Sequence, residues 1–417
     1  MTPFALLSAL ISLAALFSFI SFRVLRLPAT VGVMLLSLAS SIALILAGRN
    51  APGLDAVVSA AMGRIDFTAV VLHGMLAFLL FAGALNLDLN QLSREKLPVL
   101  ILSIFGTLLS TAIVAGLLKL ILYAVGLSAP LIPCLLFGAL ISPTDPIAVL
   151  EMLHRVGVPI SLETQLAGES LFNDGIGAVL FLSLVEASST GNLPHVGHFI
   201  ALLLVKAGGG IALGLALGYA VYRLLRLVDS YRVEVLLTLA LAMGGYALAD
   251  ALRLSAPLEV VAAGLIAGGR ARRLAMSALT RDHVNNFWEV VDDILNVLLF
   301  LLMGLELLVL SLNRSFFYAG LLAIPAVLLA RFVSVGASFG VLRIVRRPVR
   351  GTIAILTWGG LRGGLAIALA LAIPPGPQRS ELLAITYIVV VFSIMVQGLS
   401  MEKLLKHFHA TAPARSV

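Results

Sequence analysis

Two carboxylates lie within an apolar stretch of the chain, GESLFNDGIGAVLFLSL, at residues 168–184. Glu169 and Asn173 are four residues apart, and so are Ser170 and Asp174. In a helix, which turns by about 100° per residue, these four side chains fall within an arc of about 140° on one face. Because an unpaired carboxylate is costly in an apolar medium, this face must look into protein or water.

The preceding apolar run is interrupted by SPTDP. Pro143 and Pro146 have no N–H group, so the carbonyls of Ala139 and Ser142, four residues earlier, lose their helical donors. Such an interruption survives in a membrane only beside protein or a cavity. With Asp145 inside it, the pattern is typical of the midplane ion sites of secondary transporters. The alternative is a proline kink in which Asp145 only caps the second half-helix.

Together, Thr144, Asp145, Ser170 and Asp174 supply the carbonyl, hydroxyl and carboxylate oxygens that a hard monovalent cation prefers. The Asp174 anion is costly in a low-dielectric site, so a proton and a metal cation are rival ways of neutralising it. A site that either ion must fill, and that faces one side at a time, predicts an exchanger. A structural network of helix ends paired with arginine is the alternative.

The composition predicts the setting of these residues. Of the 417 residues, 60% are hydrophobic and only 12% are charged, which indicates a polytopic all-α membrane protein. The single cysteine, Cys134, excludes an intrachain disulfide and a cysteine-based metal site. The apolar N-terminal segment lacks a basic region and a cleavage site, so we expect a retained span.

Apolar windows of about 20 residues, long enough to cross about 30 Å of hydrocarbon, recur along the whole chain. We predict thirteen spans, at 3–22, 29–48, 66–86, 97–125, 131–153, 162–186, 196–225, 231–252, 256–269, 284–310, 316–345, 352–374 and 381–404.

Orientation follows from the basic residues, because 19 of the 28 fall in alternate connections, among them Arg270, Arg272 and Arg273. The positive-inside rule places these connections in the cytoplasm, with the N-terminus outside and the C-terminus inside. The net charge of +7 is thereby explained by topology and contacts with lipid headgroups, without nucleic acid.

Four basic residues fall inside the predicted spans. Lys119 and Lys206 can extend their stems toward the interface. Arg331 and Arg362 lie deeper and need partners.

Five motifs, SPTDPIAVL, GESLFNDGIGAVLF, FLLMGLEL, LLARFVSV and GGLRGGLAIALALAIP, resemble in order and spacing the monovalent cation:proton antiporter family. This family includes bacterial and archaeal electroneutral sodium/proton antiporters and eukaryotic sodium/proton exchangers. The resemblance implies one membrane domain, 1–417, with crossing discontinuous helices and a dimerisation domain. This domain would consist of a first repeat at 3–186, a linking span at 196–225, an inverted second repeat at 231–404 and a cytoplasmic tail at 405–417.

The resemblance assigns Asn173 and Asp174 as the family's Asn-Asp pair, with Asp174 as the main carrier of cation and proton. It implies that Asp145 contributes through its side chain or a bound water, Thr144 through its carbonyl and Ser170 through its hydroxyl. These residues would hold the transported cation.

The resemblance also implies an intramembrane ion pair between Glu169 and Arg331. Arg362 would lie near the second helix break, with its charge opposite carbonyl ends of half-helices. One departure concerns the third span, where many prokaryotic relatives carry a Glu and this chain has Ala82. A third carboxylate at the site is therefore in doubt.

The sequence thus predicts an antiporter of the cell membrane that exchanges sodium or lithium for protons, and the resemblance implies a homodimer that serves pH homeostasis. Because Asn173 adds no second titrating carboxylate, one-for-one electroneutral exchange is the simplest stoichiometry. We expect no cofactor and no enzymatic activity, since no Ser/His or His–metal set lies in the spans. A potassium-preferring antiporter, an organic-solute symporter and a channel are the alternatives.

Overall fold

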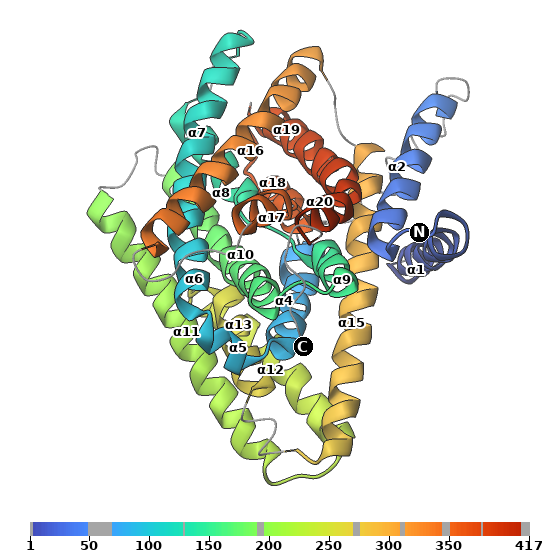
Figure 1. Ribbon diagram of the computed structural model, residues 1–417, viewed down its shortest axis with the longest axis vertical. Helices are drawn as coiled ribbons and strands as arrows, with labels where there is room; N and C mark the ends of the chain where they lie inside the picture. The colour runs from blue at the N-terminus through green and yellow to red at the C-terminus, as the bar shows by residue number, and fades with distance from the viewer. Residues whose placement is uncertain are drawn as a thin grey trace.

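The computed structural model describes residues 3–48, 69–127, 130–189, 196–269, 276–308, 313–343, 351–376 and 378–409. Within these ranges every regular element is a helix (Figure 1), so the all-α prediction is confirmed. Of the described helices, 8 are long and apolar enough to cross a membrane. Shorter apolar helices add to them, at Val70–Asn86, Leu131–Ile141 and Ala256–Gly268.

The first half of the chain follows the predicted spans closely. Its elements are α1 (Pro3–Ile20), η1 (Ser21–Leu25), α2 (Ala29–Gly48), η2 (Ala69–Met75), α4 (Leu76–Asn86), α5 (Leu89–Arg94), α6 (Lys96–Leu100), η3 (Ile101–Gly106), α7 (Thr107–Ala124), α8 (Leu131–Ile141), α9 (Ile147–Val156) and α10 (Ile160–Ser189).

The second half of the chain also consists of helices. Its elements are α11 (Val196–Leu225), α12 (Tyr231–Ala251), α13 (Ala256–Gly268), α15 (Ala278–Leu305), η4 (Glu306–Leu308), α16 (Arg314–Leu342), α17 (Thr352–Trp358), α18 (Gly364–Leu371), α19 (Arg379–Phe392), η5 (Ser393–Gly398) and α20 (Leu399–His409).

Three predicted boundaries lie outside the described residues, namely the start of the third span at 66, the end of the tenth at 310 and the end of the eleventh at 345. The predicted tail, 405–417, begins within α20, which continues to His409, and residues 410–417 lie outside the described residues. Leu405 is 1% exposed, and its burial keeps this last stretch packed as a helix.

Helices α11 and α13 pack closely, as the run KAGGGIALGLALG predicts. A Cβ atom at Gly210 would overlap the carbonyl oxygen of Ser255, and one at Gly214 would overlap that of Glu259. Glycine at these positions therefore lets the two backbones touch.

The helices form two packed groups. One contains α4, α11, α12, α13 and α15, and the other contains α7, α8, α10, α16 and α19, with the short α17 and α18 at its centre (Figure 1). The groups meet where α10 lies on α13. There a Cβ atom at Gly175 would lie 2.8 Å from Leu258 Cγ, so the contact leaves no room for a larger residue.

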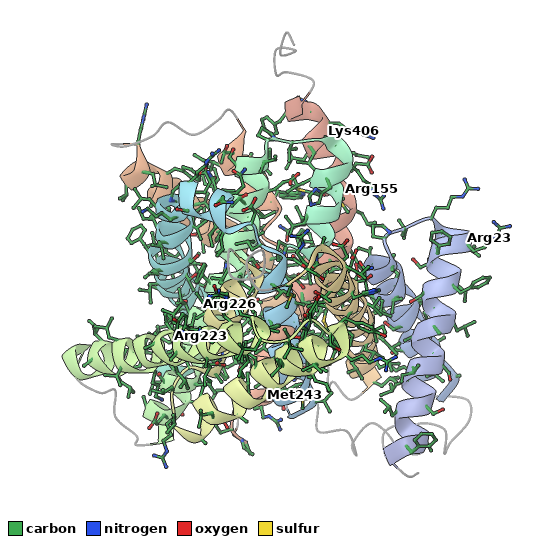
Figure 2. The ribbon with its side chains drawn as sticks, turned by 90° about the horizontal axis from the view of Figure 1, so that it is seen from below. Arg23, Arg155, Arg223, Arg226, Met243 and Lys406 are labelled. Carbon is green, nitrogen blue, oxygen red and sulfur yellow. The ribbon has the colours of Figure 1, made fainter. Side chains whose placement is uncertain are left out.

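One end of the molecule brings together basic residues from distant parts of the sequence. Arg155, at the end of α9, and Lys406, on α20, lie near each other in Figure 2, and these two helices pack together. Lys406 Nζ lies 2.5 Å from Glu402 Oε1 one turn earlier. Both residues therefore lie at the same end of the molecule.

Candidate functional site

Two interrupted helices cross near the middle of the molecule (Figure 1). Residues 142–146 separate α8 from α9, and residues 359–363 separate α17 from α18. The two extended segments form an antiparallel bridge in which the Asp145 N–H donates to the Leu361 carbonyl at 2.8 Å. This bond satisfies backbone groups that the interruptions leave without helical partners.

Gly363 lets the two segments come this close. A Cβ atom there would overlap the side chain of Asp145. The backbone at Gly363 is extended, with φ −114° and ψ −158°, so space and not torsion demands glycine. Gly360 likewise has no space for a side chain, because a Cβ atom there would lie 2.8 Å from Arg331 Nε and 3.1 Å from Thr144 Cγ2.

The polar face of α10 is joined to the first interruption. Asn173 Nδ2 donates to Thr144 Oγ1 at 3.0 Å, and Asn173 Oδ1 accepts the Thr144 N–H at 3.2 Å. The Ser170 hydroxyl donates to the Thr144 carbonyl. Asn173 is 0% exposed and both ends of its amide are used on Thr144, so it holds the interruption against α10.

Asp145 and Asp174 are both half-buried and lie beside the crossing of the two interrupted helices. Asp145 Oδ1 accepts the Ile147 N–H, the first N–H of α9, at 3.1 Å, while Pro146 occupies the N-cap position. The Asp174 carboxylate has no hydrogen-bond or ion-pair partner among the described residues. The two carboxylates are close enough to repel each other electrostatically. Among the described residues, the structure thus leaves a carboxyl group without a protein partner beside the crossing.

Glu169, one residue before Ser170, is fully buried and paired. Arg331, from α16, holds it in a two-point contact, with Arg331 Nη2 at 2.9 Å from Glu169 Oε2 and Nη1 on Oε1. Arg331 also donates to the Leu356 carbonyl from Nη2 at 3.1 Å and from Nε at 3.3 Å. The predicted partners therefore meet, and this buried arginine has its charge balanced.

Arg362 lies in the second interruption and is 2% exposed. Its Nη1 donates to the carbonyls of Ser142 at 2.7 Å and Pro143 at 2.8 Å. The Ser142 carbonyl is one that Pro146 frees. The guanidinium therefore stabilises the carbonyl end of α8, where the helix dipole is negative.

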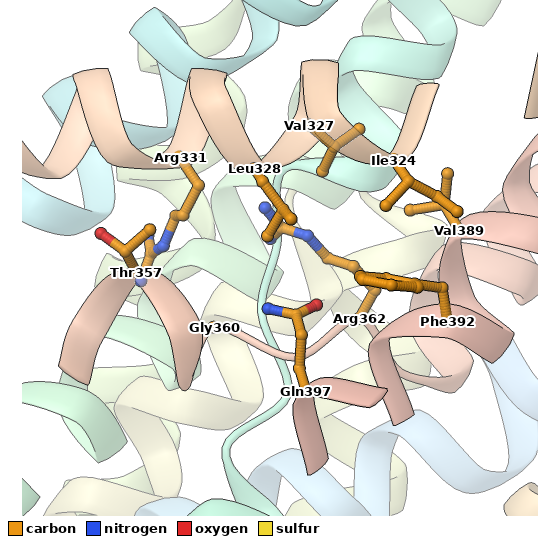
Figure 3. A pocket seen from close by; sticks show the side chains of 10 residues that line it. All are labelled: Ile324, Val327, Leu328, Arg331, Thr357, Gly360, Arg362, Val389, Phe392 and Gln397. Atoms are coloured by element: carbon orange, nitrogen blue, oxygen red, sulfur yellow. The ribbon is translucent and has the colours of Figure 1, made fainter. Parts of the chain in front are cut away.

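A small pocket lies behind the crossing, between α16, α17 and η5 (Figure 3). The side chains of Arg331 and Arg362 reach into it from opposite sides, Gln397 lies below it and Phe392 to the right in Figure 3. Thr357 Oγ1, which lines the pocket, has no hydrogen-bond partner among the described residues. Both arginine side chains thus line one pocket.

Sequence reasoning missed two participants at the crossing. Ser393 Oγ accepts the Arg362 N–H at 2.9 Å, and no sequence signal distinguishes this serine from others. Gly363 could have been found, because the paired glycines of WGGLRGG recur on both sides of an intramembrane arginine. Ala82, in place of the glutamate of many relatives, is fully buried in α4.

The chain is similar to known proteins in both sequence and fold. The model of a family described as sodium/hydrogen exchanger, transmembrane, matches residues 9–407. The Na(+)/H(+) antiporter NhaP of Pseudomonas aeruginosa is 45% identical over 415 residues, which covers 98% of this chain and 97% of that protein. The Na(+)/H(+) antiporter NhaH of Halobacillus dabanensis is 35% identical over 350 residues, covering 82% and 83%.

The fold resembles a solved structure. The sodium proton antiporter MjNhaP1 from Methanocaldococcus jannaschii matches with a TM-score of 0.75 and 21% identity, covering 96% of both chains. At this identity the likeness concerns the fold. The relatives favour antiport over the symport and channel alternatives.

Proposed function

The chain belongs to the sodium/hydrogen exchanger family, and from this premise we propose that it exchanges sodium or lithium for protons across the membrane at Asp174. The supporting observation is the balance of charge at the crossing. Glu169 is neutralised by Arg331, and Asp145 accepts the Ile147 N–H, whereas Asp174 has no hydrogen-bond or ion-pair partner among the described residues. Asp174 is then the carboxylate at the crossing that needs an ion.

The oxygens around Asp174 suit a dehydrated monovalent cation. The Asp145 and Asp174 carboxylates, the Thr144 carbonyl and the Ser170 hydroxyl are the ligands we propose. Asn173 positions Thr144 through its two hydrogen bonds. The Ser170 hydroxyl, which donates to the Thr144 carbonyl, would rotate so that both oxygens face the cation.

Competition then drives the exchange. A proton on Asp174 removes the negative charge that attracts the cation, and a bound cation excludes the proton. Because an empty site leaves two carboxylates facing each other, the site changes sides only when it is filled. One cation replaces one proton, so the cycle moves no net charge and needs no cofactor.

The group that contains α7, α8, α10, α16 and α19, with the crossing at its centre, is the part of the molecule that we expect to move. We propose that it shifts as a rigid body against the group containing α11 and α13, within a homodimer of the cell membrane. The N-terminus would lie outside and the C-terminus in the cytoplasm. Gly175, on the helix that carries Asp174, is in close contact with Leu258 of α13. We propose that α13 is part of the surface against which the moving group slides.

Proton flux in proteoliposomes tests the proposal. The purified protein is reconstituted with a pH-sensitive dye, and sodium, lithium, potassium or choline is added at zero and at an imposed potential. We expect a response to sodium and lithium, no response to choline and no dependence on voltage. Electrogenic exchange would depend on voltage, because moving one elementary charge across 100 mV changes the free energy by about 2.3 kcal/mol. A response to potassium alone would refute the ion assignment, and no response to any cation would refute the mechanism.

A further inference from the structure

A polar stripe on α15, consisting of Asp292 and Asn296, lies outside the site described above. These two residues and Leu299 are spaced at i, i+4 and i+7, so they share one face of the helix. Leu299 contacts the start of α18, where a Cβ atom at Gly364 would overlap its side chain. The stripe therefore begins one turn from the second interruption and runs toward the start of α15.

Asn296 has an oxygen that lacks a partner. The residue is 1% exposed, and its Oδ1 has no hydrogen-bond donor among the described residues. Its side chain lies one turn from Asp292 on the same face of α15, so the oxygen without a donor is near that carboxylate. A buried amide oxygen without a donor is costly, so this position calls for a cation or water.

Asp292 continues a series of carboxylates that leads to the crossing. It is half-buried and experiences repulsion from Asp293, Asp145 and Glu289, and Asp145 in turn repels Asp174. Asp293 and Glu289 are exposed. Negative charge thus extends from the exposed carboxylates in the middle of α15 through Asp292 to the candidate site. A cation relieves this repulsion at each step.

We propose that Asp292 and Asn296 form an outer binding step, which takes sodium or lithium from the water on the side where α15 begins and passes it to Asp145 and Asp174. This inference rests on the proposed function. The Asp292 carboxylate and the Asn296 carbonyl oxygen replace part of the hydration shell, and water supplies the remaining ligands. The cation therefore loses its shell in two stages.

Asp292→Asn and Asn296→Leu test this step in proteoliposomes, with the KM and maximal rate measured for sodium and lithium on the side where α15 begins. We expect KM to rise about fivefold in each variant, which corresponds to about 1 kcal/mol since a tenfold change is 1.4 kcal/mol. The maximal rate should stay unchanged, because Asp174 still carries the ion. Asp292→Glu keeps a carboxylate and should restore KM.

Asp293→Asn is the matched control, because it removes the same charge from an exposed neighbour outside the stripe. A specific binding step requires that this variant keep the KM of the wild type and that the Asp292→Asn effect persist when choline chloride raises the ionic strength. An equal rise in both variants, or its loss at high ionic strength, would mean general surface attraction and overturn the proposal. An unchanged KM in Asp292→Asn overturns it and leaves the proposed function standing. A wild type that exchanges no cation overturns both.

Discussion

Removal of the Glu169 charge tests the reasoning about buried ion pairs most directly. Glu169 and Arg331 are 0% and 3% exposed, and each charge is satisfied mainly by the other. In Glu169→Gln the guanidinium keeps its bonds to the Leu356 carbonyl but has no counter-ion. Breaking such a pair from one side costs about 4 kcal/mol.

This cost can be expressed as a melting temperature. Unfolding entropy is about 2.1 cal/mol/K per residue, or about 0.9 kcal/mol/K for a chain of this length, so the expected fall is roughly 4–5 °C. Thermal unfolding of the purified variant in detergent, followed by the loss of monodisperse protein, measures it. The double variant Glu169→Gln/Arg331→Met should recover most of the loss, because it leaves no unpaired charge.

Glu186→Gln provides the control, since it removes a carboxylate that lies 2.8 Å from Lys206 Nζ with a side chain 59% exposed. An exposed pair contributes only about 0–1 kcal/mol, so this variant should melt within about 1 °C of the wild type. If Glu169→Gln also melts within about 1 °C of the wild type, or no lower than Glu186→Gln, the buried pair does not stabilise the fold as argued.

Three further predictions concern transport. Asp174→Asn and Asp145→Asn should each abolish sodium-driven proton flux in proteoliposomes while the protein stays folded, since the amides keep the shape and remove the charge; turnover like the wild type in Asp174→Asn would end the single-carrier mechanism. Gly363→Ala should lower the melting temperature and the exchange rate, because overpacking costs about 1–3 kcal/mol, whereas Gly336→Ala, where nothing lies within 4 Å, should do neither. Lowering the pH should raise the apparent KM for sodium by up to about tenfold per pH unit with an unchanged maximal rate, since a proton on Asp174 excludes the cation by mass action; a KM independent of pH would contradict competition at one carboxylate.

Much of the fold was predictable because its determinants are local. Apolar windows define the spans, and the missing N–H groups of Pro143 and Pro146 stop α8 before α9 begins. Helical periodicity places Ser170 and Asn173 on one face of α10, where both contact Thr144. These properties act over a few residues, so the sequence alone determines them.

The sequence by itself therefore determined the membrane class, most spans, the first interruption and the polar face of α10. Only the tertiary structure decided which residues, distant in the sequence, contact the first interruption and the polar face of α10. Glu169 and Arg331 are 162 residues apart, and Arg362 and Ser142 are 220 apart, so no periodicity relates them. The need for Gly363 and the free oxygen of Asn296 arise in the same way, because steric space and hydrogen-bond satisfaction depend on which helices meet.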